Sequence, residues 1–475
     1  MSIEYRHNTS SQLDILYHLQ NVSSAFVHDL SSRVDVKEYS QKLFSMAERE
    51  EAWSGDNLIG LVAYYINHDT QKAFITNVSI DIRFQKQGIA TKLLKNAKCV
   101  AIEERMKLIS LEAANDDELI AFYLHNGFSL HKRVMDSNSE LIMHLVPMVV
   151  IRCTVYNHEL YLRDCLEGVV MQQTNFPFVA IVHDDASTDN SAAIIREYEE
   201  KYPNIIKPIY ETENQYSKQD GSLGRIMNAA IEVTGAKYVA MCEGDDYWTD
   251  PLKLQKQVDF MEANPEYVIC CHRYKIYNQN DGTWDKDYIH QLFDKSPNGF
   301  SFSNKENFEN WATKTLTLLI RQDALRKMPA RKGFKYWRDV HMNYYLLKQG
   351  KGFCMPFLGA VCTRHNGGVF SSIGAMNQWR INLKVWNELL CQNREDEVLL
   401  AFYQKQHNAY RDYIVSNIFQ QRKNEIVLDI KTLLMLDIEY GGIKSVIFSI
   451  KQMILALKSL TKKKIKKCIN HFFQY

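Results

Sequence analysis

The sequence predicts an α/β protein with two sheet-containing units and a helical C-terminal extension. Apolar spacing predicts strands and helices in the first unit: strands at 58–65, 73–80, 107–113 and 141–146, and helices at 89–104 and 117–126. From Met148 a new strand begins, and strand and helix patterns alternate to about residue 250, which favours a sheet with crossover helices. After Trp379 the pattern is wholly helical. We therefore expect domains at 1–146, 148–380 and 381–475.

Composition restricts the function classes. The 475 residues suffice for two to four domains, and 57 basic against 56 acidic side chains give no global field that would attract nucleic acid. The ten cysteines show no zinc-ligand spacing and suggest a reducing compartment. The first residues lack the apolar run of a signal peptide, so we expect none, and no apolar run reaches the ~18 residues needed to span a bilayer. We expect a cytoplasmic protein, or one that lies on a membrane surface.

A glycine-bearing turn in the first unit predicts a pyrophosphate site. Gln85 and Gly88 lie between a predicted strand and a predicted helix, and Ile89, Ala90 and Thr91 begin that helix. The N–H groups at a helix N-terminus are unpaired and suit a phosphate group, and glycine permits a close backbone approach.

This segment resembles the GCN5-related N-acetyltransferases (GNAT) over about residues 3–146. Gln85, Gly88 and Ala90 match the family's (Q/R)-x-x-G-x-(G/A) motif, and Asn115 with Phe122-Tyr123 and Gly127-Phe128 matches a later motif. The resemblance implies a GNAT-type mixed sheet and acetyl-CoA as co-substrate. The implied cofactor-binding residues are Val78, Ile80, Gln85, Gly88, Ile89, Ala90, Thr91 and Asn115. Tyr123 would protonate the departing thiolate, whereas Asp81, Glu112, His7 or an ordered water remain alternatives for the base.

Acidic residues cluster where a strand of the second unit ends. Glu243, Asp245 and Asp246 follow the apolar run 238–241, and Asp184 and Asp185 follow another at 179–182. Ligands bind at the carboxyl ends of strands in open α/β sheets, and hard divalent cations prefer carboxylate oxygens. A manganese or magnesium site is therefore expected here.

These motifs resemble the family 2 glycosyltransferases with the A-type, Rossmann-like fold, across about residues 148–370. Thr154, Tyr156 and Asn157 match a turn that contacts the nucleoside. Asp184-Asp185-Ala186-Ser187-Thr188-Asp189 matches D-D-x-S-x-D, in which Asp185 would hold the base. Residues 243–246 match D-x-D-D, with glutamate in place of the first aspartate. The resemblance therefore assigns the metal to Asp246 with Asp245, and the ribose to Asp245.

The same resemblance implies an inverting mechanism with Asp339, at a predicted helix start, as the base that deprotonates the acceptor hydroxyl. A further stretch, Thr363-Arg364-His365-Asn366-Gly367-Gly368, resembles the family's Y-R-x-H-x-G-G with one residue fewer between Arg and His. That departure puts a metal or diphosphate role for His365 in doubt.

The C-terminal end is basic and amphipathic. Residues 443–475 contain eight lysines and no acid. Lys444, Lys451 and Lys458 recur every seven residues, and the pattern places an apolar set on the opposite side: Ile443, Val446, Ile447, Ile450, Ile454 and Leu457. Such a helix suits an anionic membrane surface. The alternative is a helix that packs on the enzyme and exposes its lysines to solvent.

Together these features predict a glycosyltransferase that moves a sugar from a nucleotide-sugar to a glycan acceptor, expected to be lipid-linked in surface polysaccharide assembly. The first domain would acetylate an amino sugar. Two alternatives stay open: the first domain is an inactive binding or assembly module, or it acetylates an unrelated amine. An unblocked acetyl-CoA tunnel beside Gly88 would favour catalysis, and a side chain filling that tunnel would favour the module.

Overall fold

The computed structural model describes residues 3–23, 30–135, 138–330, 333–368, 373–417 and 423–472. The chain forms two compact units, and each is described by itself. The first comprises Met1–Val149 with Thr174–Phe178 and Glu232–Ala236, and the second comprises the rest of the chain.

The first unit is a seven-stranded mixed sheet with helices on both faces. Its elements are β1 (Ile3–His7), α1 (Gln12–Val22), α2 (Val36–Met46), β2 (Glu48–Ser54), β3 (Asn57–Asn67), β4 (Lys72–Ile80), α3 (Ile89–Glu103), β5 (Leu108–Ala114), α4 (Asp117–His125), β6 (Ser129–Met135) and β7 (Asn138–His144). The strand order is β1-β2-β3-β4-β5-β7-β6, and only β4 and β5 pair in parallel among the printed pairs of this sheet.

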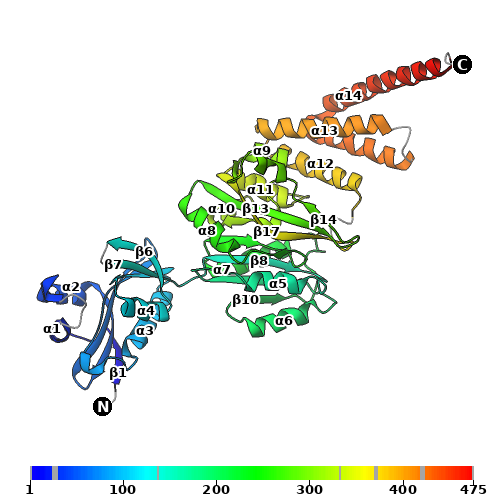
Figure 1. Ribbon diagram of the computed structural model, residues 1–475. Helices are drawn as coiled ribbons and strands as arrows, with labels where there is room; N and C mark the ends of the chain where they lie inside the picture. Colours follow the sequence, from blue (N-terminus) through cyan, green and yellow to red (C-terminus); the bar gives the residue numbers. More distant parts are fainter. Residues whose placement is uncertain are drawn as a thin grey trace. The chain divides into compact units, whose positions relative to one another are not determined.

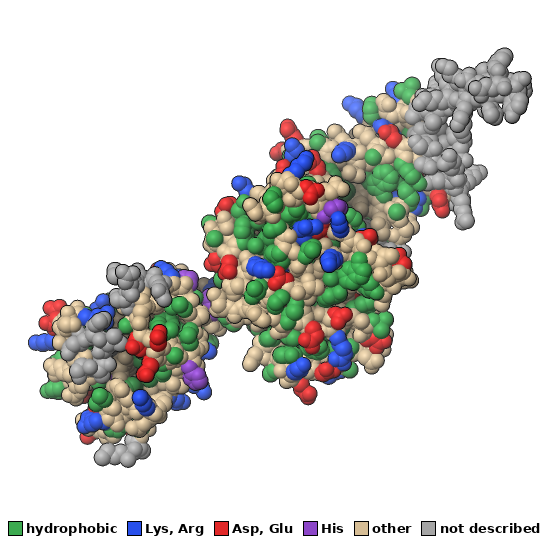
Figure 2. Space-filling model, viewed as in Figure 1, with side chains coloured by type: hydrophobic (Ala, Val, Ile, Leu, Met, Phe, Trp, Pro, Cys, Tyr) green, Lys and Arg blue, Asp and Glu red, His purple; other side chains and the backbone are tan. Residues whose placement is uncertain are grey.

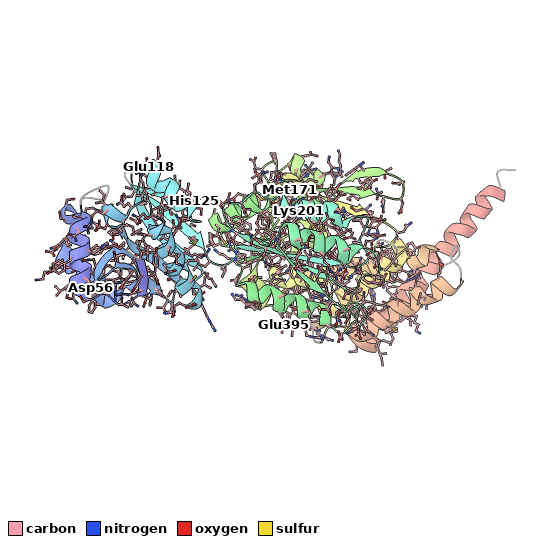
Figure 3. The ribbon with its side chains drawn as sticks, turned by 90° about the horizontal axis from the view of Figure 1, so that it is seen from below. Asp56, Glu118, His125, Met171, Lys201 and Glu395 are labelled. Carbon is pink, nitrogen blue, oxygen red and sulfur yellow. The ribbon has the colours of Figure 1, made fainter. Side chains whose placement is uncertain are left out.

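Two hydrophobic clusters hold helices against this sheet. The helices and the sheet are labelled in Figure 1. Helices α1 and α2 pack through Ile15, Leu19 and Leu43, whereas α3 and α4 pack through a second cluster that includes Leu93 and Tyr123. Helix α4 also complements its own dipole, because Glu118 lies in its first turn and His125 in its last (Figure 3).

Strand β4 separates from β5 halfway along its length. The parallel pairing ends at Ile75 opposite Leu111, so β4 has no pairing with β5 from Thr76 to Ile80. The pairing with β3 shifts register at the same place, since Tyr64 pairs Ile75 and Ala63 pairs Asn77. This β-bulge sends Asn77 and Ser79 to the α1 face, while Val78 and Ile80 join the α3 face.

The elements that apolar spacing predicted in this unit are present as β3, β4, β5, β7, α3 and α4. Strand β2 was not predicted, because its sequence is polar (EREEAWS). In the structure nearly all of it is buried. Its acids are satisfied inside: Glu51 accepts hydrogen bonds from Thr9, Ser10 and Trp53. Hydrogen-bonded buried carboxylates leave no apolar signal in the sequence.

The second unit is built on a ten-stranded mixed sheet. Its elements are β8 (Val149–Val155), α5 (Leu162–Val170), β9 (Phe178–Asp184), α6 (Ser191–Lys201), β10 (Ile206–Tyr210), α7 (Ser222–Thr234), β11 (Tyr238–Met241), β12 (Tyr247–Trp248), α8 (Lys253–Ala263), β13 (Tyr267–Asn278), β14 (Thr283–Lys286), β15 (Phe300–Phe302), α9 (Asn304–Asn310), β16 (Leu319–Arg321), α10 (Gln322–Arg326), α11 (Asp339–Leu347) and β17 (Lys351–Arg364). The strand order is β10-β9-β8-β11-β16-β13-β17-β12, with β14 on β13 and β15 on β17. The carboxyl ends of β8, β9 and β11 carry the predicted nucleotide and metal motifs.

Three helices complete this unit: α12 (Ala375–Gln392), α13 (Glu397–Asn417) and α14 (Lys423–Phe472). They lie side by side (Figure 1) and share a core that includes Leu383, Tyr410 and Leu433. Helix α14 is interrupted at Gly442, whose φ of 65° and ψ of −160° are not helical. Within the described residues, none of the helices combines the length and apolarity that a membrane crossing requires.

Beyond Gly442, α14 packs by one side only. Ser449 is buried and Met453 contacts the shared core, whereas Ile443, Ile447, Ile450 and Ile454 are exposed, Ile443 by 76%. Lys444 and Lys451 are exposed as well. Figure 2 shows such hydrophobic side chains on the surface of the helical part. The side chains from 456 onward, including Lys458 and the lysines at 462–467, lie outside the described residues.

Candidate functional sites

Three carboxylates converge directly after β11. One oxygen from each of Glu243, Asp245 and Asp246 lies within 4.8 Å of the others. We call residues 242–246 the acidic loop. It is bonded to β8, because the Cys242 N–H donates to the Arg152 carbonyl (3.1 Å) and the Gly244 N–H donates to the Thr154 carbonyl (3.0 Å). The predicted metal residues and the nucleoside turn after β8 are thus neighbours.

Glycine is required at position 244 by close packing. A Cβ atom there would lie 2.8 Å from Nδ1 of His158 and 2.9 Å from Cγ2 of Val155. Both distances are far shorter than a normal van der Waals contact, so any larger residue would push the acidic loop away from β8.

The acidic loop has the electrostatics of a cation site. Burial and the charge of Asp245 raise the pKa of Asp246 to about 8. Desolvation and the charge of Asp245 also raise the pKa of Glu243, although the Glu243 side chain is partly exposed to solvent. The charge of Lys314 lowers both pKa values, but burial and the neighbouring carboxylates outweigh it. Oxygen ligands in this number and spacing therefore fit a hard divalent cation.

His365 reaches the acidic loop despite the shortened motif. Its Nε2 lies 3.1 Å from Oδ2 of Asp245, and its ring lies 4.5 Å from that of Tyr161. Burial alone would raise the pKa of Asp245, but the hydrogen bond from His365 and the nearby charges of His158 and His365 outweigh it and lower that pKa. The missing residue between Arg364 and His365 thus does not remove His365 from the site.

Asp339 begins α11, as predicted, and lies near the acids. Its Oδ1 accepts a hydrogen bond from the Val340 N–H (3.0 Å). Its charge contributes to the raised pKa of Glu243, so the two carboxylates are close enough to interact. Asp339 is thus a carboxylate that interacts with the acidic loop and is separate from its three clustered acids.

On the nucleoside side, the turns after β8 and β9 are locked together. The Asn157 N–H donates to Ser187 Oγ (3.0 Å), and Asn157 Oδ1 accepts from the Thr188 N–H (2.8 Å). Asn157 adopts a left-handed φ of 57°, which asparagine tolerates. Thr154 lies at the end of β8, and Tyr156 is exposed beside this turn.

The two aspartates after β9 differ in their partners. The Asp185 carboxylate accepts from the backbone N–H groups of Gln215 (2.6 Å) and Tyr216 (3.0 Å), which fix it in place. Oδ1 of Asp184 is buried and has no hydrogen-bond partner among the described residues. A role for Asp185 in binding the nucleobase stays a prediction. Asp184 is a second carboxylate near this turn, and its Oδ1 is able to accept a hydrogen bond from a ligand.

Two further residues of this site carried no recognisable sequence signal. His158 lies against Gly244, and its Nδ1 is buried without a hydrogen-bond partner in the described structure. Burial alone would lower the pKa of Lys314, but Cys362, Asp246 and Glu243 outweigh it and raise that pKa. Lys314 comes from an irregular segment about 70 residues after the acidic loop, which only the fold brings back.

In the first unit, the predicted pyrophosphate turn has the expected geometry. Gly88 is the residue before α3 and has φ of 78°, and no side chain caps the helix N-terminus. A Cβ atom at Gly88 would meet nothing within 4 Å, so the space beside it is open. Ile89 is buried, whereas Gln85 and Thr91 are exposed, and the Gln85 side chain donates to the Ile80 carbonyl (3.2 Å).

The other predicted acetyl-CoA residues lie on both sides of the gap between β4 and β5. Val78 and Ile80 belong to the part of β4 that does not pair with β5. Asn115 directly follows β5 and accepts a hydrogen bond from Ser139 Oγ. Tyr123 is buried and shares its hydrophobic cluster with Ile80, Ile89 and the half-buried Ala90. Burial raises the pKa of Tyr123, so its hydroxyl stays protonated at neutral pH and is able to act as a donor.

The alternatives for the acetyltransfer base have different surroundings. The Asp81 carboxylate is held by the Arg83 guanidinium (2.6 and 3.0 Å), which lowers its pKa. Glu112 is exposed and pairs across the sheet with Glu140. His7 is hydrogen-bonded to Glu50 (2.7 Å). None of the three is singled out by these contacts.

A buried polar array near the bulge was missed by sequence reasoning. His18 of α1 places Nδ1 3.0 Å from the Leu58 carbonyl and Nε2 2.9 Å from Ser79 Oγ, and Ser79 lies 2.8 Å from Oδ1 of Asn77. Burial lowers the pKa of His18 to about 4, so the ring is neutral near pH 7. A lone histidine in an amphipathic helix gives no signal of such an array.

Comparison with known proteins assigns both units to families. Residues 13–128 match the Acetyltransferase (GNAT) family, and residues 151–328 match Glycosyl transferase family 2. The chain therefore joins a GNAT-family domain to a glycosyl transferase family 2 domain.

Individual relatives cover parts of the chain. A Mycobacterium tuberculosis protein of uncharacterised function is 41% identical over 28% of this chain and 36% of its own length, so the chain spans about a third of that relative. The Bacillus subtilis protein TuaG, named as a teichuronic acid biosynthesis glycosyltransferase, is 28% identical over 50% of this chain and 86% of its own length. Among solved structures, Staphylococcus aureus TarS 1–349 in complex with UDP-GlcNAc is 15% identical with a TM-score of 0.47, covering 67% of this chain and 92% of TarS 1–349.

Proposed function

We propose that the chain is a metal-dependent, inverting glycosyltransferase that moves a sugar from a nucleotide-sugar to a glycan acceptor, fused to an acetyl-CoA-dependent N-acetyltransferase. The observation that carries the first activity is the convergence of Glu243, Asp245 and Asp246 at the end of β11, with Asp339 close enough to influence Glu243. The family 2 match supports the same reaction class.

In this proposal each group near the acidic loop has one task. Asp246 and Asp245, assisted by Glu243, would hold a manganese or magnesium ion, which neutralises the charge that develops on a leaving diphosphate. Asn157, Asp184 and Asp185 would contact the nucleoside. Asp339 takes the proton of the acceptor hydroxyl as that oxygen attacks the anomeric carbon from the side opposite the diphosphate, which inverts the configuration.

Screening the full-length chain with the common nucleotide-sugars tests this proposal. We expect release of nucleoside diphosphate from at least one donor in the presence of manganese, because water can replace the acceptor. Chelation with EDTA should reduce that release to background, and added manganese should restore it. Release that resists EDTA would contradict metal dependence, and no release from any donor would contradict the donor class.

For the first unit we propose acetyl transfer from acetyl-CoA to an amine, with an amino sugar as the acceptor. The half of β4 that does not pair with β5 and the start of α3, which no side chain caps, support a bound cofactor rather than an inactive assembly module. Backbone N–H groups at the start of α3 would receive the pyrophosphate, and Val78 and Ile80 would pair with the pantetheine arm.

Replacing Tyr123 by Phe should slow acetylation of a nucleotide-linked amino sugar about 100-fold, the size expected for loss of a general acid. Binding of acetyl-CoA, measured by calorimetry on the full chain, should stay unchanged because the ring and its packing remain. Tyr17→Phe, on the exposed face of α1, is the matched control. If the wild-type chain does not bind acetyl-CoA, the inactive-module alternative is favoured.

We further propose that the glycan acceptor is lipid-linked and that the enzyme works on the cytoplasmic membrane surface. The relative TuaG is named for teichuronic acid biosynthesis. In this chain, the exposed residues Ile443, Ile447, Ile450 and Ile454, together with the exposed Lys444 and Lys451, offer a membrane-facing surface. Exposed apolar rows of this kind are unusual on a helix that faces only water.

Removing residues 443–475 should release the protein from vesicles that contain phosphatidylglycerol. Each lysine near an anionic surface contributes on the order of 1 kcal/mol. Replacing Lys462, Lys463, Lys464, Lys466 and Lys467 by Gln should therefore abolish most binding in a vesicle sedimentation assay, with little change on neutral vesicles. The matched control replaces five exposed lysines of the first unit: Lys37, Lys72, Lys95, Lys98 and Lys107. Equal loss in the control, or unfolding of the truncated chain, would indicate a structural helix instead.

A further inference from the structure

The hairpin of β13 and β14 ends beside the acidic loop. Tyr161 donates its hydroxyl hydrogen to Oε1 of Gln279, in the turn of this hairpin, and the Tyr161 ring also contacts that of His365 at a tilt of 34°. The Gln279 N–H donates to the Arg364 carbonyl (2.9 Å), at the end of β17. Since His365 contacts Asp245, the side chains of Tyr161 and His365 connect the hairpin turn to the acidic loop.

The two faces of this hairpin have different neighbours, and one of them faces the acidic loop. In the parallel pairing of β13 with β17, Arg364 is the partner of Asn278 and Cys362 is the partner of Ile276. Partners side by side in a sheet present their side chains on the same face. The Cys362 side chain interacts with Lys314 and lies near Asp246. Arg364 is therefore on the face of the acidic loop.

Trp284 lies on the opposite face. It pairs directly with Tyr277, one residue out of step with Asn278, and the two rings are 4.8 Å apart. On the face of the acidic loop, Asn278 and Arg364 both contact the Asp285 carboxylate, at 3.1 and 3.7 Å. The hairpin thus carries exposed aromatic residues, but only one face is continuous with the candidate active site.

Tyr288 completes that face. Its ring is 66% exposed, and the Arg364 guanidinium lies 5.7 Å from the ring centre and donates to the Tyr288 hydroxyl. Arg364 is held by Tyr288 and Asp285, which fixes the direction of its remaining N–H groups. A large aromatic ring left in water beside an oriented guanidinium is an amphipathic surface, with an apolar face and adjacent donors.

A sugar ring has the complementary chemistry. One of its faces presents C–H groups that stack on an aromatic ring, and its edge presents hydroxyl oxygens that accept hydrogen bonds from a guanidinium. We propose that Tyr288 and Arg364 form the binding site for the sugar of the glycan acceptor, next to the acidic loop and on the same face of the sheet. This inference rests on the proposed glycosyltransferase function and names the part of the chain that selects its acceptor.

The test measures binding of the full-length chain, with UDP and manganese, to an array of hexose, N-acetylhexosamine and hexuronic acid oligosaccharides. We expect the wild type to bind at least one class, and Tyr288→Ala to weaken that binding at least about 10-fold, within the range seen for loss of an aromatic anchor. Tyr288→Phe keeps the ring and should retain most of the affinity. Trp284→Ala is the matched control, because it removes an exposed aromatic ring from the other face of the same hairpin, and it should bind like the wild type.

Three outcomes would overturn the inference: no binding of any glycan by the wild type, equal binding by Tyr288→Ala and wild type, or equal losses in Tyr288→Ala and Trp284→Ala. Donor hydrolysis by the wild type and by Trp284→Ala, measured on the same preparations, separates this failure from failure of the proposed function. If both hydrolyse a nucleotide-sugar while the array pattern contradicts a role for Tyr288, the glycosyltransferase proposal stands and the acceptor site lies elsewhere. If neither hydrolyses any donor, the proposed function itself is rejected.

Discussion

Asp246→Asn should lower release of nucleoside diphosphate at least about 100-fold, an effect comparable to removal of other preorganised groups that stabilise developing charge. Asparagine has the shape of aspartate but lacks its negative charge, so it is a poor ligand for a hard cation. Its side-chain oxygen can still accept the hydrogen bond from the Thr363 N–H that Asp246 receives at 2.9 Å. Thermal unfolding of the variant should therefore stay close to that of the wild type.

Binding of manganese, followed by electron paramagnetic resonance on the full-length chain, separates a ligand from a merely structural acid. The variant should bind manganese more weakly than the wild type in the absence of nucleotide. Retention of more than about a tenth of the activity, against the much larger loss expected for a charge-stabilising group, would remove Asp246 from the metal site. An unfolding transition shifted far below that of the wild type would instead assign Asp246 to the stability of the loop.

Asp339→Asn should lower turnover about 10²- to 10⁴-fold while leaving donor affinity unchanged. The carboxylate acts only when the acceptor hydroxyl loses its proton, so the loss should fall on kcat and not on binding of the nucleotide-sugar. At about 1.4 kcal/mol per decade, the barrier would rise by about 3 to 6 kcal/mol.

The control must separate a base from an acid that merely favours a helix start. Asp323 is the acid in the first turn of α10, as Asp339 is in α11, but it is exposed and none of the described interactions link it to the acidic loop. Asp323→Asn should leave both kcat and donor affinity unchanged. Weakened donor binding with normal turnover in Asp339→Asn would contradict a role as base.

Much of the fold followed from apolar spacing, and its failures have physical causes. Strands such as β3 and β8 are continuous apolar runs because both faces are buried. Strand β2 carries buried glutamates that only tertiary partners explain. The two-residue strand β12 follows the acidic loop and is defined by its pairing with Val361 and Ala360, more than a hundred residues away. Local periodicity contains no information about such a partner.

The candidate site divides in the same way. Asp246, Asp245 and Gly88 belong to short motifs whose spacing is local, so the sequence indicated them directly. Lys314 and Tyr288 belong to no such motif, and the contact between His365 and Asp245 joins distant parts of the sequence. These residues come together only through the long strands β13 and β17. The assignment of Asp185 shows a further limit, because a motif names two adjacent carboxylates but does not reveal that backbone N–H groups occupy one of them.

The bulge at Thr76 also bears on how the first unit could diversify. It separates two side-chain sets within five residues of one strand: Val78 and Ile80 on the face of α3, and Asn77 and Ser79 on the face of α1. Substitutions at Asn77 or Ser79 can alter what approaches from one face while the backbone offered to the cofactor stays the same. Insertion or deletion of a single residue there would exchange the two sets and bury polar groups where α3 packs. Variation in this segment should therefore consist of replacements and spare the number of residues between Ile75 and Ile80.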